Sequence, residues 1–246
     1  MSLPKDSECI VFDNGSDSFD PKETLSQCGR NIILYRVHHN MGIDGIFMEA
    51  INFLKNKNVG WAWFIGDDDF LIEESQFVFS KKWNANIVIV NSIGESQIEK
   101  YRDSVGIQKE IEYIAATPKL FFRNFSLRMP FGSVILNVNN IELSNTERWN
   151  GTHHLYSGLL WDHLSNSAKD ECVFIDTPAF CRGEGQQTWT SYKKEVYERI
   201  GIWFGLIPDA FRAEAETVFN RVWLPHNCPS QFRELAMKSY LKQLSK

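Results

Sequence analysis

The chain has 246 residues, a formal net charge of −5 and a hydrophobic content of 43%, which fits one large domain, or one domain with an appendage, and provides for a real core. Its lysines and arginines are scattered, which argues against a nucleic-acid partner, and no apolar run reaches the ~18 residues of a membrane-spanning helix. The opening residues lack an apolar signal core, and the five cysteines form no CxxC pair, as expected for reduced thiols in a cytoplasmic protein.

The first part of the chain alternates between apolar runs typical of strands and segments in which apolar residues recur at helical spacing. Turn residues and glycines separate these segments. The predicted strands are 9–12, 31–37, 59–65 and 85–90, and the predicted helix is 46–54. This alternation predicts an α/β domain built on a mostly parallel sheet with covering helices.

The second part of the chain predicts fewer strands and then only helices. Further strands are predicted at 132–138 and 172–176, and further helices at 93–130, with a turn near Pro118, and at 154–164. From Tyr192 to Leu244 the pattern is purely helical. We therefore expect a sheet domain over residues 1–191 and a helical appendage packed on it over residues 192–246.

Three consecutive carboxylates follow the predicted strand 59–65, directly after Gly66. Ligands of open α/β sheets bind at the carboxyl ends of the strands, so Asp67, Asp68 and Asp69 are expected at a binding edge. Neighbouring carboxylates repel each other unless a cation lies between them, and oxygen ligands suit Mg²⁺ or Mn²⁺. The triplet therefore predicts a metal–diphosphate site, with a solvated acidic turn as the alternative interpretation.

Four motifs follow one another along the chain: Asp13-Asn14-Gly15-Ser16 after a strand, Asn40-x-Gly42-x-x-Gly45 before a helix, Trp61-x-Trp63-Phe64-Ile65-Gly66-Asp67-Asp68-Asp69, and Gly151-Thr152-His153-His154. Their order and spacing resemble family 2 glycosyltransferases of the GT-A fold. The last two motifs are similar to the abequosyltransferase-like branch of bacterial surface-polysaccharide enzymes. The resemblance covers roughly residues 8–190, and it implies a GT-A-like, Rossmann-like sheet with flanking helices.

The resemblance implies a role for each residue of a donor site. Asp13 would accept a hydrogen bond from the nucleobase, with Asn14 beside it, and Asn40 and Gly42 would lie close to the nucleotide. The Asp67–Asp69 triplet stands at the DXD position. There the first two carboxylates would contact the nucleotide-sugar, and the first and third would hold Mg²⁺ or Mn²⁺ on the diphosphate. Independently of the resemblance, glycine lets a backbone approach a ligand closely.

The acceptor side is implied to lie at two histidines and at a segment that contains glycines. Many family members carry a Glu-Asp pair where this chain has His153 and His154, and imidazole accepts protons near neutral pH. We assign the general base to His154 or to Asp162, two turns further along the helix, and acceptor binding to His153. Gly183 and Gly185 begin a segment that would close over the donor. The alternatives are a packed helix start for the histidines and an ordinary surface loop for the glycines.

The implied activity is sugar transfer from a nucleotide-sugar donor to a glycan or lipid-linked glycan acceptor in bacterial cell-surface polysaccharide biosynthesis. The reaction would be metal-assisted and inverting. Such an enzyme would be cytoplasmic and would work at the inner face of the membrane. The apolar stretch 202–207 then has two interpretations, which are peripheral membrane contact and helical core or dimer contact.

The N-terminal part departs from the family pattern. Family members usually open with a further strand, turn and helix, whereas only eight residues precede Cys9. One wall of the nucleotide pocket and one strand would then be missing, so we expect an unpaired sheet edge. Because exposed edges invite pairing with a second chain, a homodimer through the strand 9–12 is the expected compensation.

Two other functions fit part of the sequence. A phosphohydrolase of the haloacid-dehalogenase type would use Asp13 as its nucleophile, but it needs a second Asp two residues on, where this chain has Gly15. A degenerate glycosyltransferase-like module that binds without catalysis would fit the missing first strand. The order of the motifs favours the transferase over both.

Overall fold

The structure, a computed structural model, describes residues 7–17, 20–27, 32–72, 75–105, 113–127, 131–143, 145–167, 172–183 and 193–246. The strands formed by these residues are β1 Cys9–Asp13, β2 Ile32–Arg36, β3 Trp61–Trp63, β4 Phe70–Leu71, β5 Ile87–Gly94, β6 Tyr113–Ala116, β7 Val134–Asn137 and β8 Cys172–Arg182. The helices are α1 Pro21–Ser26, α2 Gly42–Asn56, α3 Ser75–Ser80, α4 Ile98–Val105, α5 Pro118–Phe125, α6 Thr146–Trp149, α7 Leu155–Asn166, α8 Lys193–Leu206, α9 Arg212–Val218, α10 Leu224–His226 and α11 Arg233–Leu244.

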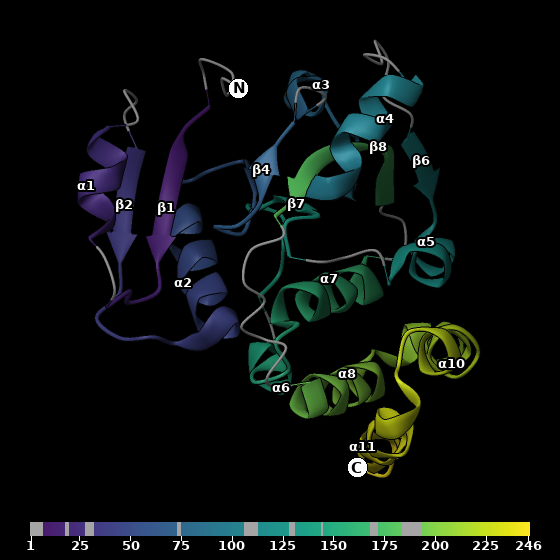
Figure 1. The fold of residues 1–246 in the computed structure, drawn as a ribbon. Coiled ribbons are helices and arrows are strands. Elements are labelled where there is room, and N and C mark those ends of the chain that lie inside the picture. Colours follow the sequence, from purple (N-terminus) through teal and green to yellow (C-terminus); the bar gives the residue numbers. More distant parts are fainter. Residues whose placement is uncertain are drawn as a thin grey trace.

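These strands form two sheets with helices around them (Figure 1). β1 and β2 pair in parallel, with Cys9 opposite Ile32 and Asp13 opposite Arg36. The larger sheet has the strand order β3-β7-β5-β8-β4, and β6 also pairs with β8. The protein is therefore α/β, as the alternation of strands and helices predicts.

The prediction of a mostly parallel sheet is wrong, because the larger sheet is mixed. β5 and β8 run parallel, but the β3–β7, β5–β7, β4–β8 and β6–β8 pairs are antiparallel. The apolar composition of a strand reports its burial and not its direction. A helical crossover is what makes neighbouring strands parallel, and β7 enters the sheet between β3 and β5 in the opposite direction.

Several segments differ from their predicted extent, among them β5, which is expected to end at residue 90 and continues to Gly94. The strand expected at 59–65 is only Trp61–Trp63, and it lies at the edge of the sheet with Trp61 38% exposed. β6 occupies residues expected to be helical, because pairing with β8 outweighs the polar local pattern. β8 itself continues to Arg182, beyond its expected end at residue 176, since its second half pairs with β4 and β5.

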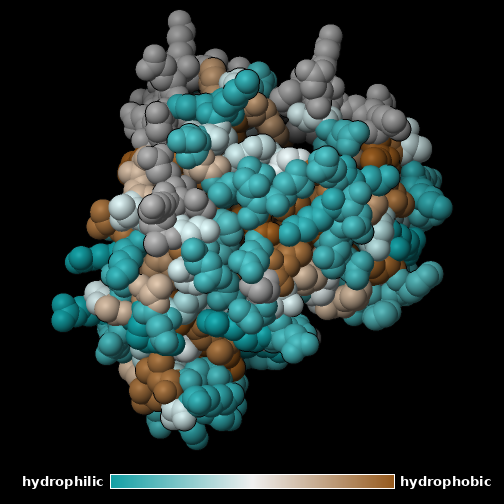
Figure 2. Space-filling model, turned by 180° about the vertical axis from the view of Figure 1, so that it is seen from behind, coloured by the Kyte–Doolittle hydropathy of each residue, from teal (hydrophilic) through white to brown (hydrophobic). Residues whose placement is uncertain are grey.

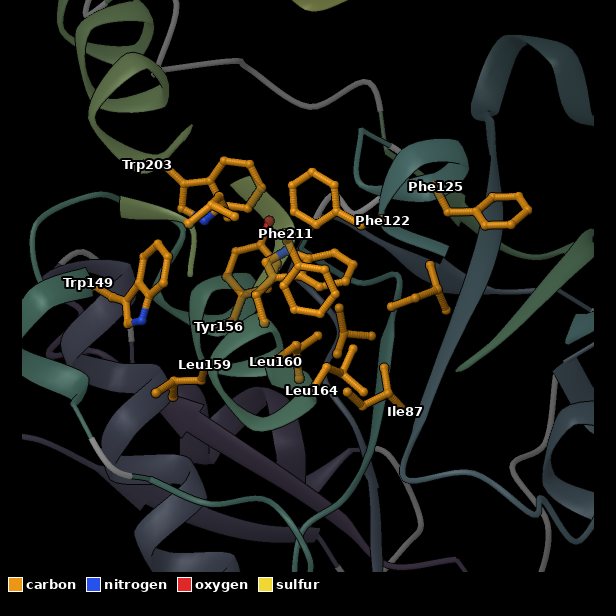
Figure 3. Close-up of a cluster of buried hydrophobic side chains, with 14 of the residues drawn as sticks. Ile87, Phe122, Phe125, Trp149, Tyr156, Leu159, Leu160, Leu164, Trp203 and Phe211 are labelled. Atoms are coloured by element: carbon orange, nitrogen blue, oxygen red, sulfur yellow. The ribbon is translucent and has the colours of Figure 1, made fainter. Parts of the chain in front are cut away.

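The C-terminal segment 193–246 contains helices and turns, and its aromatic side chains join the core of the sheet domain. Phe122 of α5 stacks on Trp203 of α8 and on Phe211, with ring centroids 6.4 and 5.7 Å apart (Figure 3). In the stretch 202–207, Trp203, Phe204 and Ile207 are buried. These three side chains therefore belong to the helical core.

Figure 2 shows the opposite face of the molecule, where hydrophobic residues form small groups between hydrophilic ones. One group lies at the lower end, over the C-terminal helices, whose exposed apolar side chains include Val222, Leu241 and Leu244. Exposed apolar side chains are ordinary on folded proteins. Among the helices that the structure describes, none is both long and apolar enough to cross a membrane.

Helix α2 packs against both sheets (Figure 1). The ring of Phe53 lies 5.6 Å from that of Phe12 in β1 and 5.3 Å from that of Tyr35 in β2. Phe47 and Leu54 of the same helix are buried in the main core with residues of β5 and β7. α2 therefore ties the small sheet to the large one.

Within the described residues, β1 pairs with β2 on one edge and has no strand on the other. Its side chains Cys9, Ile10, Val11 and Phe12 are only partly buried, although such an apolar run is typical of a strand buried on both faces. β3 likewise pairs with β7 alone. In the described part of the chain, β1 and β3 are therefore edge strands, as occur in every open sheet.

We expect Phe53→Ala to loosen the small sheet selectively. Phe53 is only partly buried, so the free energy of unfolding should fall by about 1–3 kcal/mol, less than for a fully buried aromatic ring. Amide hydrogen exchange should show the loss of protection mainly in β1 and β2. Leu54→Ala, on the main-core face of the same helix, is the matched control and should lower protection in the larger sheet as well. Equal loss in both sheets for Phe53→Ala would contradict the linking role of α2.

The open edge of β1 predicts self-association through this strand. Light scattering should find a dimer of the wild-type chain, and Val11→Lys should shift it to monomer, because a charge on an edge strand opposes pairing. Ile33→Lys, on the neighbouring strand and already 40% exposed in its wild-type form, should leave the dimer intact. A monomeric wild-type chain would show that this edge does not recruit a second copy.

Candidate functional site

The triplet Asp67–Asp69 forms a turn between β3 and β4, in which the first two side chains are exposed and the third is partly buried. Loss of surrounding water and the neighbouring charge of Asp68 raise the pKa of the Asp69 carboxyl. Backbone N–H groups and the charge of Arg182 act against this rise. Ionised Asp69 is therefore in an unfavourable position that a cation beside it would relieve.

Two glycines allow other parts of the chain to approach the acidic turn closely. Gly132 has a φ of +100°, and a Cβ at this position would lie 2.7 Å from Asp69 Oδ2. A Cβ at Gly183, just after β8, would lie 1.9 Å from the carbonyl oxygen of Asp68. Side chains do not fit at such distances, so both positions need glycine. Closure of the segment that begins at Gly183 stays a prediction, and Gly185 lies outside the described residues.

Carboxylate oxygens of the triplet are the groups that would hold a divalent cation. Among the described residues, no group of three or more His, Cys, Asp or Glu side chains is arranged to hold a metal ion. Mg²⁺ commonly binds through one or two carboxylates and takes further oxygens from substrate phosphates. The residues at hand therefore fit Mg²⁺ or Mn²⁺ in a complex with a phosphate ligand.

Asp13 ends β1 and Arg36 ends β2, and their side chains form an ion pair. Arg36 Nε lies 3.0 Å from Asp13 Oδ2, and the Ser16 N–H donates to Asp13 Oδ1 at 2.9 Å. Burial would raise the pKa of Asp13, but the hydrogen bonds from Ser16 and the charge of Arg36 hold it below its usual value. Oδ2 is buried and accepts no hydrogen bond from the described residues, and Arg36 is its ion-pair partner.

A pocket of about 280 Å³ opens beside this ion pair, and its lining residues are Gly15, Asp17, Arg36, Val37 and His38. It lies at the carboxyl ends of the parallel strands β1 and β2. This is the usual position of ligand sites in α/β proteins, and the volume is close to the lower limit of about 300 Å³ for ligand pockets.

Asn14, Asn40 and Gly42 lie together at the start of α2. Asn14 Nδ2 donates to Asn40 Oδ1 at 3.1 Å, the Gly42 N–H donates to the same oxygen at 2.8 Å, and the Met41 N–H donates to Asn14 Oδ1 at 2.9 Å. Gly15 has a φ of +74°, and a Cβ there would lie 2.7 Å from the backbone of the facing loop. These bonds fix the loop that leads into α2.

Asp44, in the first turn of α2, fixes the turn that carries the two histidines. Its buried carboxylate accepts hydrogen bonds from the His153 N–H at 2.9 Å and from the Leu155 N–H at 3.1 Å. His153 has a left-handed φ of +62°, which is uncommon for a residue other than glycine. A side chain from another part of the sequence therefore sets the conformation at the start of α7.

The two histidines have different surroundings. His154 is partly buried, and its ring lies 6.1 Å from that of Tyr156 and 6.2 Å from that of Trp203. The pKa of His154 is lowered to about 4, mainly because the ring is buried and to a smaller extent because His153 lies beside it. His153 is exposed, and desolvation is the largest cause that lowers its pKa. Of the two candidates, His153 is thus the one that is open to a ligand.

Asp162, the other candidate for a general base, is 4% exposed and has structural partners. The indole N–H of Trp149 donates to Asp162 Oδ2, and Arg148 Nη1 lies 3.4 Å from Oδ1. Burial raises the pKa of Asp162 in spite of these two contacts. The structure places this carboxylate in the core and not with the exposed His153.

An aromatic cluster brings the separate site segments together. The ring of Phe47 in α2 lies 4.8 Å from that of Phe64, just before the acidic turn, and 6.0 Å from that of Tyr156 in α7. It also lies 6.4 Å from the ring of Phe131, which precedes Gly132. Three turns therefore pack around helix α2: the acidic turn, the turn at Gly132 and the turn that carries the histidines. The hydrogen bonds of Asn14, on the loop after β1 (here the Asn14 loop), hold the start of this helix.

Sequence patterns do not identify four residues of this arrangement, which are Arg36, Asp44, Gly132 and Arg182. Each acts on a partner that is distant in the sequence, and a single sequence does not reveal such pairs. An acidic residue in the first turn of a helix is common because it interacts well with the helix dipole. That signal alone would not connect Asp44 with the histidines.

Comparison with protein-family models and with curated proteins finds no match to the chain. The resemblance to family 2 glycosyltransferases therefore stays an expectation that rests on the order and spacing of the motifs. The residues of the site carry the functional argument.

We expect Asp69→Asn to stabilise the metal-free protein at neutral pH. Because the pKa of Asp69 is raised in the folded state above its ordinary 3.8, the folded state binds this proton more tightly than the unfolded chain does. Stability therefore falls as the pH rises through the range between the two values. The variant should melt at a higher temperature than the wild type at pH 7 and at the same temperature near pH 3. A lower melting temperature at pH 7 would mean that the hydrogen bonds of the carboxylate outweigh the repulsion.

Proposed function

We propose that the protein is a nucleotide-sugar-dependent glycosyltransferase of the family 2 type with a GT-A-like fold. The observation that carries this proposal is the packing of the acidic turn and the histidine turn around Phe47, on the helix whose start the Asn14 loop holds. A nucleotide-sugar presents a base, a diphosphate and a sugar to its enzyme. Groups suited to each of the three lie on these segments.

The base would bind at the ends of β1 and β2. Asp13 is ionised, and its Oδ2 is buried without a hydrogen-bond donor among the described residues, so a nucleobase N–H reaches it only if the side chains that cover it move apart. The pocket beside it offers room for a ring between Gly15 and His38. The Asn14–Asn40 pair would shape the backbone near the ribose and the diphosphate.

The diphosphate would bind at the acidic turn. Asp67 and Asp69 would hold Mg²⁺ or Mn²⁺, and Asp68 would contact the nucleotide-sugar. The cation supplies a Lewis acid that stabilises the charge of the leaving diphosphate. Gly132 and Gly183 support this role, because Gly132 leaves space for the Asp69 carboxylate and Gly183 leaves space for the backbone carbonyl of Asp68.

In the reaction, an acceptor hydroxyl attacks the anomeric carbon from the side opposite the nucleoside diphosphate, which inverts the configuration. The new carbon–oxygen bond forms as the bond to the diphosphate breaks. The hydroxyl proton passes to a base at the acceptor side. A glycan or lipid-linked glycan of a bacterial cell surface is the proposed acceptor, and the proposed location is the cytoplasmic face of the membrane.

The two other functions account for less of the structure. A nucleophilic role for Asp13 is disfavoured because this carboxylate is 6% exposed and paired with Arg36. A module that binds without catalysis is favoured by the open edges of β1 and β3. It predicts nucleotide binding with no turnover of any nucleotide-sugar, which separates it from the transferase.

Isothermal titration with UDP, GDP, dTDP and CDP, each with Mn²⁺, tests the donor site. The wild-type chain should bind one of these nucleotides at least tenfold more tightly with the cation than without it, because phosphate oxygens complete the metal shell. Asp69→Asn should lose this metal dependence while remaining folded. Asp103→Asn removes an exposed carboxylate of α4 and is the matched control. Absence of nucleotide binding by the wild-type chain would refute the proposal.

A further inference from the structure

A cluster of charged side chains lies around His153, and three elements contribute to it. Asp44 comes from α2, and Glu195 and Arg199 come from α8. Arg199 forms an ion pair with Glu195, and its guanidinium also donates to the carbonyl oxygen of Gly151. α2, α8 and the turn before α7 therefore meet at this exposed imidazole.

Hydrogen bonds hold the backbone of this turn along its length. Asp44 accepts the N–H groups of His153 and Leu155, and Arg199 holds the carbonyl of Gly151. Thr152 Oγ1 donates to the carbonyl of Trp149 at 2.7 Å and accepts a hydrogen bond from the His154 N–H at 3.1 Å. The left-handed conformation of a non-glycine residue is strained and persists only where the surroundings impose it. Here the surroundings impose it at a histidine.

The same turn gives the two neighbouring histidines opposite roles. His154 packs on the rings of Tyr156 and Trp203, which belong to the main core. His153 is exposed beside the charged cluster. A group that takes a proton from a substrate must reach it directly or through one water, and only the exposed member of this pair meets that condition.

We propose that His153, and not His154, accepts the proton of the acceptor hydroxyl, and that Asp44 is the residue that positions it. The inference rests on the proposed glycosyl transfer. The O–H bond of the acceptor breaks, its electron pair forms the bond to the anomeric carbon, and the proton moves to a nitrogen of the imidazole. The electron pair of the broken bond to the donor leaves with the nucleoside diphosphate.

The charges around His153 suit this role. Desolvation and Arg199 lower the pKa of His153 below its ordinary value of 6.5, while Asp44 and Glu195 act in the opposite direction. The imidazole is therefore free of its proton at neutral pH and ready to accept one. After the transfer, the two carboxylates stabilise the imidazolium that has formed.

His153→Gly tests the role of the side chain without straining the fold, because glycine adopts a positive φ readily. The variant should be at least as stable as the wild type. Its kcat should nevertheless fall by about 100-fold or more, the usual contribution of a general base, with the KM of the donor unchanged. Added imidazole should restore part of the rate. His154→Gln is the control, and it should lower the melting temperature and change kcat by less than about tenfold.

The positioning role of Asp44 has its own readout. Asp44→Asn leaves one oxygen for the two backbone N–H groups, so kcat should fall while the metal-dependent affinity for nucleotide stays at the wild-type value. Glu195→Gln should shift the pH midpoint of kcat downward, and Arg199→Gln should shift it upward. NMR titration of the His153 imidazole should show its titration midpoint lowered in Glu195→Gln and raised in Arg199→Gln. This measurement does not require catalytic turnover. If the charged cluster had only a structural role, removing the charge of Glu195 or Arg199 would leave the pH midpoint of kcat unchanged.

Turnover is measured as hydrolysis of UDP-glucose, GDP-mannose, dTDP-glucose and CDP-glucose, with water as the acceptor. A wild-type rate in His153→Gly, or a lost rate that imidazole does not restore, would overturn the role of His153. Unchanged NMR midpoints in both α8 variants would overturn the charged cluster. Failure of the wild-type chain to bind nucleotide or to hydrolyse any of these donors would instead refute the proposed function.

Discussion

One buried carboxylate connects the two halves of the proposed site. Asp44 is 5% exposed, and it accepts hydrogen bonds from two backbone N–H groups more than a hundred residues further along the chain. Without this side chain, both N–H groups would lose their partner in a place with little water, and an unsatisfied buried group is costly. The position of α2 relative to α7 therefore depends on this contact, and with it the distance between donor and acceptor groups.

Helix α2 extends this control to the rest of the molecule. Its first turn follows the Asn40 loop, its middle carries Phe47 against the acidic turn, and Phe53 near its end packs on the small sheet. The proposed nucleotide side and the proposed acceptor side are thus attached to one helix. A ligand that moves the start of α2 would move the histidine turn as well, because Asp44 lies only a few residues from Asn40.

The sequence predicts those parts of the fold that depend on local chemistry. Apolar runs mark β1, β2, β5, β7 and β8, because period and turn residues are visible in a single chain. The carboxylates lie in the turn between β3 and β4, with three residues between them and the end of β3. Strand direction, the pairing of β6 and the burial of Asp162 depend on distant partners. The same limit applies to the histidines, since the motif places both at the start of α7 and only the packing of Trp203 separates their roles.

The two acidic positions of the donor site differ in how the protein balances their charge. Asp13 has Arg36 at 3.0 Å, so it is stable as an anion without any ligand. Asp69 has a neighbouring carboxylate and an exposed arginine, and its ionised form is disfavoured. The pair of Asp13 and Arg36 therefore needs no charge from a ligand, whereas a ligand at the acidic turn has to bring positive charge. The proposed complex of a nucleotide-sugar with a divalent cation brings that charge to the acidic turn, and the nucleotide alone does not.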